Sequence, residues 1–157
     1  MGRENAQLLR DLLANRGQLL QQLQGLHEES AWARPEPEEW STVEVLQHVA
    51  DVDQLAVRRF SDIQSGKANM TGYDRADWEG VRKAAEEDGL AGVLLRLNSA
   101  RQEMLQAISD LSEADLEKAA SHPRYGRMTI RQVIDMELRH DLDHAQQIAK
   151  TRAVVEK

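Results

Sequence analysis

The chain has 157 residues, of which 41% are hydrophobic and 30% are charged, and it contains no cysteine. A chain of this size can bury one hydrophobic core, so we expect one domain covering residues 1–157. The absence of cysteine excludes disulfides, thiolate metal ligands and a cysteine nucleophile. Any metal bound by this chain must therefore be held by histidine and carboxylate side chains.

The charge of the chain argues against two classes of partner. The formal net charge is -7, which opposes binding to a phosphate backbone, and no run of Lys and Arg with interleaved aromatic residues is present. No apolar run approaches the roughly 20 residues that a membrane-spanning helix needs. We therefore expect a cytoplasmic protein that binds neither nucleic acid nor a membrane.

The first predicted helix covers about residues 4–26. Its leucines recur with the 3.6-residue period of a helix that buries one face: Leu8, Leu9, Leu12, Leu13, Leu19, Leu20, Leu23 and Leu26. The segment 27–40 carries two of the three prolines and is predicted to be a loop.

A second helix is predicted to begin after Ser41. Ser41 and Glu44 have the spacing of a capping box, and Trp40 and Val45 occupy the two positions of a hydrophobic staple. The helix is expected to end near residues 65–66, where a glycine occurs.

Two long connections and two further helices complete the prediction. Residues 66–89 are expected to form a connection with a short helical stretch starting at Asp77, followed by a third main helix over 90–108. Residues 112–128 are expected to contain a short helix and then a turn, with no strand. A fourth main helix follows Thr129, which forms a capping box with Gln132. This pattern predicts an all-α four-helix bundle with long crossover connections.

Two histidines lie on the apolar stripe of the last predicted helix. His140 and His144 are one helical turn apart, so both imidazoles can face one cation. Glu137 and Asp141 lie on the same stripe, and burying such groups without partners costs several kcal/mol. The two acids are therefore candidates for orienting the histidines or for supplying an extra ligand.

A third histidine faces the interior from the second predicted helix. His48 lies among apolar residues on the core side, so the three histidines can form a metal site that leaves a position open for water or substrate. Asp51, one turn further, is placed to orient a ligand or to act as a base. The alternative is that the histidines are hydrogen-bonded to Asp51, Glu137 and Asp141 and hold no metal.

Arg101 interrupts the apolar stripe of the third main helix and requires an acidic partner. Glu137 or an anionic cofactor or substrate would supply one, which makes Arg101 a candidate cofactor-binding residue. The alternative is an arginine that extends its charged end to solvent at the bundle edge. His27 is predicted at a helix end and His122 in an exposed loop.

Four short motifs together resemble one known family. They are WSTVEVLQH at 40–48, YDRADW at 73–78, HPRYGRMT at 122–129 and HDLDHAQQI at 140–148. In their order and spacing the chain resembles the DinB/YfiT-like superfamily of metalloenzymes. The resemblance implies a four-helix bundle of unusual connectivity and frequent homodimers. It also implies a divalent metal, often nickel or zinc, at positions that match His48, His140 and His144.

The same resemblance implies a small-molecule substrate and a low-molecular-weight thiol such as bacillithiol or mycothiol. A metal-dependent thiol S-transferase is therefore the first functional hypothesis, because a bound cation favours a thiolate over a thiol. A metal-dependent hydrolase, with metal-bound water as the nucleophile and Asp51 or Glu137 as the base, is the second. A non-catalytic stress protein that binds a metal or a small ligand is the third. Three imidazoles suit zinc, nickel, copper and iron alike.

Overall fold

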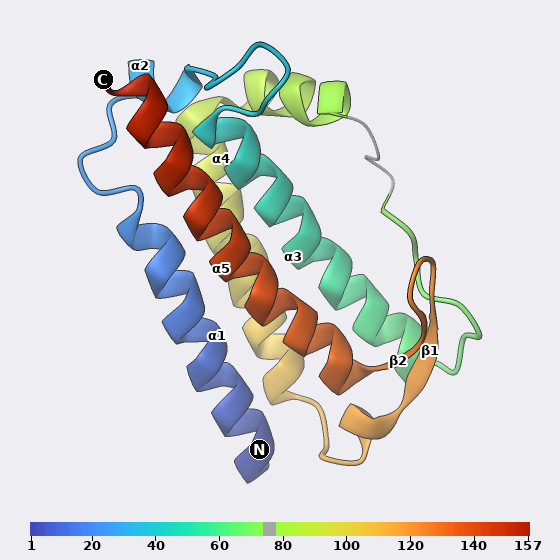
Figure 1. Cartoon of the computed structure of the whole chain (residues 1–157). Helices are drawn as coiled ribbons and strands as arrows, with labels where there is room; N and C mark the ends of the chain where they lie inside the picture. Colours follow the sequence, from blue (N-terminus) through green and yellow to red (C-terminus); the bar gives the residue numbers. More distant parts are fainter. Residues whose placement is uncertain (74–77) are drawn as a thin grey trace.

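The computed structural model describes residues 1–73 and 78–157. Four long helices dominate it (Figure 1): α1 (Arg3–Gln21), α3 (Thr42–Gln64), α4 (Trp78–Ser109) and α5 (Ile130–Val155). The shorter elements are α2 (Glu28–Trp32), the 3-10 helix η1 (Asp115–Glu117) and the strands β1 (Ala119–His122) and β2 (Gly126–Thr129). The predicted four-helix bundle is confirmed. None of the described helices is both long enough and apolar enough to cross a membrane.

The long helices are not connected as a simple up-and-down bundle. Helix α1 packs against α4 and α5, and α3 packs against the same two helices. In Figure 1, α1 and α5 run in one direction, whereas α3 and the long lower part of α4 run in the other. Because α3 and α4 are parallel neighbours, the chain must return along the whole bundle between them, as the predicted crossover connections require.

Both predicted capping boxes are present at the starts of the histidine-bearing helices. The Ser41 hydroxyl accepts a hydrogen bond from the Glu44 backbone N–H, and the Glu44 carboxylate accepts one from the Ser41 backbone N–H. Thr129 and Gln132 repeat this arrangement at the start of α5. Each box satisfies backbone donors that a helix start leaves free. The capping boxes therefore define where the two helices that carry the histidines begin.

The first helix is shorter than predicted, and the loop after it is partly helical. Helix α1 ends at Gln21, where backbone hydrogen bonds to the third residue back replace the α-helical pattern. Gly25, with a positive φ of 69°, then ends these turns. Leu23 and Leu26 still pack against the core from the hydrogen-bonded turns that follow α1. Their apolar period therefore continues beyond the true end of the helix. The short helix α2 lies within the segment predicted to be a loop.

The short helical stretch and the third main helix are both present as parts of α4. Gly89, with φ 71° and ψ 168°, separates them. Figure 1 shows the first part lying across one end of the bundle and the second part running along it. The expected start of the short stretch, Asp77, lies outside the described residues.

The prediction that the chain has no strand is wrong. Strands β1 and β2 pair antiparallel, with Ala119 opposite Thr129 and His122 opposite Gly126. Each strand has only four residues, too few to show a clear alternation of apolar and polar side chains. Hydrogen bonds join Ser121 to the backbone of Ala68 and Met70, at distances of 2.8 Å and 2.9 Å. The hairpin is thereby fastened to the segment that follows α3.

A layer of ion pairs separates two apolar clusters in the core. Each long helix supplies one side chain to it: Arg16, Asp53, Arg101 and Asp141. Each guanidinium contacts both carboxylates, at 2.9–3.0 Å, and all four residues are at most 6% exposed. The interpretation of Arg101 as an arginine that reaches solvent is therefore wrong. Asp53 and Asp141 are the acids that it requires.

Candidate metal centre

The packing of α3 against α5 brings the three predicted histidines together. His48 lies on α3, and His140 and His144 lie one turn apart on α5. The Nε2 atom of His140 is 3.1 Å from that of His48 and 2.9 Å from that of His144. Each histidine offers one ligand atom, and these atoms lie within 4.8 Å of one another. All three rings are half-buried.

Hydrogen bonds on the far side of two rings determine where their protons lie. The Nδ1 atom of His144 is 2.6 Å from the side-chain oxygen of Gln147, which can only accept, so this nitrogen carries a hydrogen. The Nδ1 atom of His48 is 3.3 Å from the Tyr73 hydroxyl, which donates its own hydrogen to Asp51 at 3.1 Å. His48 therefore donates from Nδ1 as well. In the neutral rings both Nε2 atoms present lone pairs.

The arrangement of Nε2 atoms fits a cation. The lone pairs of His48 and His144 both point towards Nε2 of His140, which carries at most one hydrogen and can satisfy only one of them. A divalent metal would accept all three nitrogens at once and leave a further position for another ligand. The outer hydrogen bonds from Nδ1 are those that metal-bound histidines usually make.

The electrostatic surroundings keep the three imidazoles neutral. Burial lowers the pKa of His48 to about 4, with a further decrease from His144 and a smaller opposing effect from Asp51. Burial, the two other histidines and the charges of Arg16 and Arg101 lower the pKa of His140 to about 2. Burial also lowers the pKa of His144. Neutral imidazole is the form that binds metals, so protons compete weakly for this site near pH 7.

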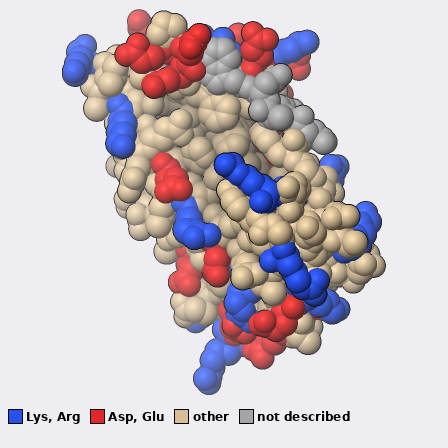
Figure 2. Space-filling model, turned by 45° about the vertical axis from the view of Figure 1, so that its right-hand side comes forward, with Lys and Arg blue, Asp and Glu red and all other residues tan. Residues whose placement is uncertain are grey.

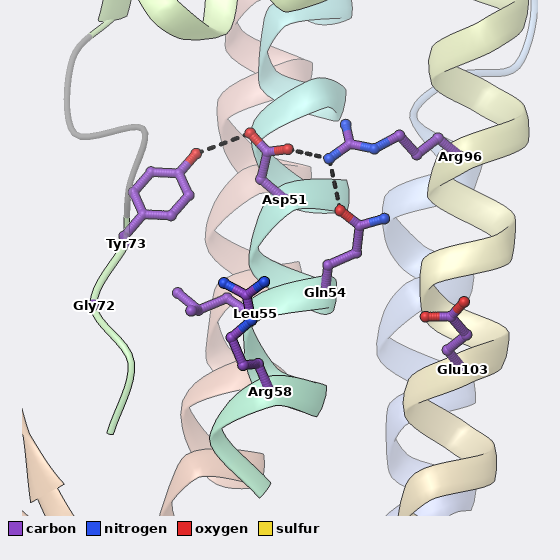
Figure 3. Close-up of a pocket in the computed structure, with 8 residues that line it drawn as sticks. All are labelled: Asp51, Gln54, Leu55, Arg58, Gly72, Tyr73, Arg96 and Glu103. Carbon is purple, nitrogen blue, oxygen red and sulfur yellow. Dashed lines mark hydrogen bonds and ion pairs between the residues drawn. The ribbon is translucent and has the colours of Figure 1, made fainter. Parts of the chain in front are cut away.

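Asp51 lies behind His48 and contacts it through Tyr73. One carboxylate oxygen accepts from the Tyr73 hydroxyl, and the other forms an ion pair with Arg96 of α4. Figure 3 shows Asp51 between these two side chains, with Gln54 accepting a second hydrogen bond from Arg96 at 2.8 Å. These groups form one wall of a cavity of about 350 Å³ between α3 and α4. The contacts place Asp51 to orient Tyr73 and, through it, His48.

The two acids on the stripe of α5 have different surroundings. Asp141 accepts hydrogen bonds from Arg16 and Arg101 in the ion-pair layer. Glu137 is 3% exposed, and one of its carboxyl oxygens has no hydrogen-bond partner among the described residues. Burial raises the pKa of Glu137 well above its usual value; Asp53 raises it further, whereas Arg101 opposes the shift.

The remaining histidines lie elsewhere. His27 is exposed and precedes α2, where its side chain makes no capping hydrogen bond. His122 is 8% exposed, so the prediction of an exposed side chain is wrong. Its Nδ1 atom accepts hydrogen bonds from the backbone N–H groups of Arg124 and Tyr125, at 3.0 Å and 3.2 Å.

Several residues around the histidines were not predicted from the sequence. Gln147 lies one turn beyond His144 on the same side of α5, and this spacing was a usable signal. Arg16 interrupts the leucine stripe of α1, a signal of the same kind as the one at Arg101. Tyr73 is the first residue of the YDRADW motif, but its contact with Asp51 depends on the tertiary structure. Arg96 carries no comparable signal, because only the tertiary structure brings it to Asp51.

Comparisons with known proteins place the chain in a family and identify solved structures of the same fold. The sequence model of the DinB superfamily matches residues 11–148. The uncharacterized protein YuaE of Bacillus subtilis strain 168 is 29% identical over 148 residues, which cover 87% of this chain and 91% of YuaE. The solved structure of YfiT from Bacillus subtilis, described as a probable metal-dependent hydrolase with an unusual four-helix bundle topology, superposes with a TM-score of 0.80 at 16% identity. That match covers 98% of this chain and 89% of YfiT.

A second solved structure bears on the expected partners. The colibactin self-resistance protein ClbS, solved in complex with a double-stranded DNA, superposes with a TM-score of 0.70 at 16% identity. The match covers 95% of each chain. At this identity the likeness concerns the fold. The prediction that the present chain does not bind nucleic acid rests on its charge.

Proposed function

This chain belongs to the DinB superfamily, and from this premise we propose that it is a metal-dependent enzyme that activates a small thiol. His48, His140 and His144 would hold a divalent cation, zinc or nickel, through their Nε2 atoms. The observation that carries the proposal is the convergence of three Nε2 atoms, two of them with lone pairs directed at the third.

The open position of the site suits a thiol such as bacillithiol or mycothiol. A bound divalent cation lowers the pKa of a thiol or a water molecule that it coordinates. The chain has no cysteine of its own, so no protein thiol would compete for that position. The reaction class that we propose is S-transfer, in which the thiol sulfur forms a bond to an electrophilic carbon and the leaving group departs with the bonding electrons.

The surrounding residues would hold the histidines in place. Tyr73 and Asp51 orient His48, and Gln147 orients His144. We propose that Asp51 acts as a positioning residue in this way, since both of its oxygens are engaged. Burial raises the pKa of the Glu137 carboxyl, and one of its oxygens has no hydrogen-bond partner among the described residues, so Glu137 stays a candidate base or orienting group. A role for Arg101 in binding a cofactor remains a prediction. Its ion pair with Asp141 would instead fix the position of that residue, which neighbours His140.

Hydrolysis is the second candidate, because YfiT is described as a probable metal-dependent hydrolase. The same three histidines would serve it, with water in the open position. A panel of ester and amide substrates, assayed with zinc-loaded and nickel-loaded protein, tests this candidate. Turnover that disappears in His140→Ala would support it, and a panel without turnover would reject it for those substrate classes.

The metal site itself is tested by elemental analysis of protein purified without a nickel column. The wild type should retain close to one equivalent of metal per chain, and His48→Ala and His144→Ala should lose most of it. His27→Ala is the matched control, because His27 is exposed and lies outside the cluster. Equal metal content in all four proteins would reject the site.

Thiol transfer is tested with metal-loaded protein and three thiols: bacillithiol, mycothiol and glutathione. Each is mixed with a chlorinated aromatic compound or an epoxide, and loss of the electrophile is followed. The proposal predicts a rate above that of the thiol alone with at least one thiol, and the loss of this rate in His140→Ala. If none of the three thiols reacts faster with the protein than without it, thiol transfer is rejected. The metal site would not be affected by that result.

A further inference from the structure

Several cavities adjoin the three histidines, and one of them includes a histidine in its wall. The cavity between α3 and α4 borders Tyr73 and Asp51, and another, of about 450 Å³, borders Trp40 and Gln147. A larger cavity of about 670 Å³ lies between the hairpin and α5 and includes His140 in its wall. This third cavity, which we call the hairpin cavity, is therefore the best placed to deliver a molecule to the metal centre.

The charges around the hairpin cavity are mainly positive. Arg127 of β2 and Arg139 of α5 line it, against one acid, Asp143. Within the part of the chain that the structure describes, neither arginine makes an ion pair, whereas Arg16 and Arg101 each contact two carboxylates. Two exposed guanidinium groups without acidic partners thus stand beside one cavity.

Both signs of charge occur on the face that Figure 2 shows. Acidic side chains stand at its upper and lower ends and along its left side, and basic side chains are spread from its upper end through the middle to its lower end. A polyanion such as duplex DNA would meet these acidic ends. A single anionic group on a small molecule would not.

The hairpin turn is held in one conformation, which gives the cavity a defined wall. His122 accepts hydrogen bonds from two backbone N–H groups of the turn, and its ring stacks on that of Tyr125, with centroids 4.9 Å apart and an interplanar angle of 28°. The guanidinium carbon of Arg124 lies 5.6 Å from the centroid of the Tyr125 ring. Gly126, with a φ of 75°, permits the turn. Tyr125 and Arg127 are thus presented to the cavity by an ordered element.

Apolar side chains line the same cavity as the arginines and the histidine. Met128, 9% exposed, and the half-buried Met136 both line the hairpin cavity, as does the exposed ring of Tyr125. Methionine adapts its shape to a bound apolar group, and a tyrosine ring offers a flat face to one. The hairpin cavity therefore brings together cationic, apolar and histidine side chains.

From this lining we infer that the hairpin cavity binds a small molecule that carries an anionic group, such as a carboxylate, together with an apolar segment, and whose other end reaches the metal. Arg127 and Arg139 take the anionic group, and Met128, Met136 and Tyr125 take the apolar segment. The inference rests on the proposed function, because it assumes that the three histidines hold a metal. It adds the chemical class of the molecule that this metal would meet.

The test compares carboxylate thiols with their neutral amides on cobalt(II)-loaded protein. The probes are mercaptoacetate, mercaptopropionate and mercaptohexanoate, each with the corresponding amide, and binding is followed by the sulfur-to-cobalt charge-transfer absorption. For at least one chain length, the wild type should bind the carboxylate about tenfold more tightly than the amide. The preference should decrease as the salt concentration rises.

Variants show whether the two arginines cause the preference. Arg127→Gln and Arg139→Gln should each reduce the carboxylate-to-amide ratio about threefold, and the double variant should abolish it. Arg10→Gln is the matched control, since Arg10 is an exposed arginine on α1 and lines no wall of the cavity. The carboxylate-to-amide ratio of each variant is compared with that of the wild type. The two probes differ in thiol pKa, but this difference is the same for every variant and cancels in the comparison.

The outcomes separate this inference from the proposed function. A carboxylate-to-amide ratio near one at every chain length would overturn the inference, as would a preference that the double variant keeps. In either case, retention of cobalt would still support the metal site. Failure of the wild type to retain cobalt would overturn both. A tenfold preference that is lost only in the Arg127 and Arg139 variants would establish the cavity as an anion-selective substrate site.

Discussion

His140 and Asp141 are adjacent in the sequence, yet their side chains belong to different clusters. His140 directs Nε2 at the two other histidines, whereas Asp141 accepts hydrogen bonds from Arg16 and Arg101 in the core. Because neighbouring residues on a helix point about 100° apart, fixing one of them fixes the other. The ion-pair layer therefore determines the rotation of α5 that brings His140 to the two other histidines.

Removing one arginine of this layer should destabilise the protein strongly. Arg101→Met leaves two buried carboxylates to share Arg16, and a broken buried ion pair of this kind costs about 3–5 kcal/mol. The free energy of unfolding in urea, followed by circular dichroism, measures the effect. Arg10→Met, an exposed change, should stay within about 0.5 kcal/mol of the wild type. Similar stabilities for the two variants would show that the layer contributes little.

The Tyr73 hydroxyl should strengthen metal binding. Tyr73→Phe removes the group that joins His48 to Asp51, and loss of such an outer hydrogen bond typically lowers metal affinity roughly 10–100-fold. A competition titration against a chromophoric chelator measures the change. The chain's second tyrosine provides the control, because Tyr125→Phe removes a hydroxyl that makes no hydrogen bond to the three histidines in the described structure. An unchanged affinity in Tyr73→Phe would contradict the role assigned to this bridge.

Metal-free protein should lose stability in mild acid. The pKa of His48 is about 4 in the folded protein and 6.5 in a model peptide, so between these values the unfolded chain takes up a proton that the folded one does not. This favours unfolding as the pH falls from 6.5 towards 4, by on the order of 3 kcal/mol for a shift of this size. Unfolding in urea with a chelator present, repeated across this pH range, should show a smaller decrease for His48→Gln than for the wild type.

The control for this pH effect is His27→Gln, which changes an exposed histidine. It should retain the wild-type dependence on pH. If His48→Gln and His27→Gln lost stability in parallel, neutral burial of His48 would not be the cause.

Duplex DNA should not bind, even though ClbS was solved in complex with a double-stranded DNA. The net charge of -7 repels a phosphate backbone, and this repulsion is greatest at low salt. Fluorescence anisotropy of a labelled duplex, titrated with protein at low ionic strength, should remain flat. Saturable binding that weakens as salt is added would overturn this prediction.

The sequence by itself determined that there are four long helices, though not their exact ends or the short helix α2, and it placed three histidines on inward faces. In a helix the 3.6-residue period assigns each side chain to a face, so the positions of His48, His140 and His144 along the chain are enough to place them on apolar stripes. The capping boxes at Ser41 and Thr129 are equally readable, because both partners lie within one turn.

Only the tertiary structure decided which of these faces meet and what supports them. Asp53 and Arg101 lie 48 positions apart, and Tyr73 lies 22 positions from Asp51, so no local spacing predicts either contact. The hairpin that carries Arg127 is held to the segment after α3 by backbone hydrogen bonds, which leave no pattern in the side chains. Local periodicity reports the direction of a side chain, whereas its partner depends on how distant segments pack.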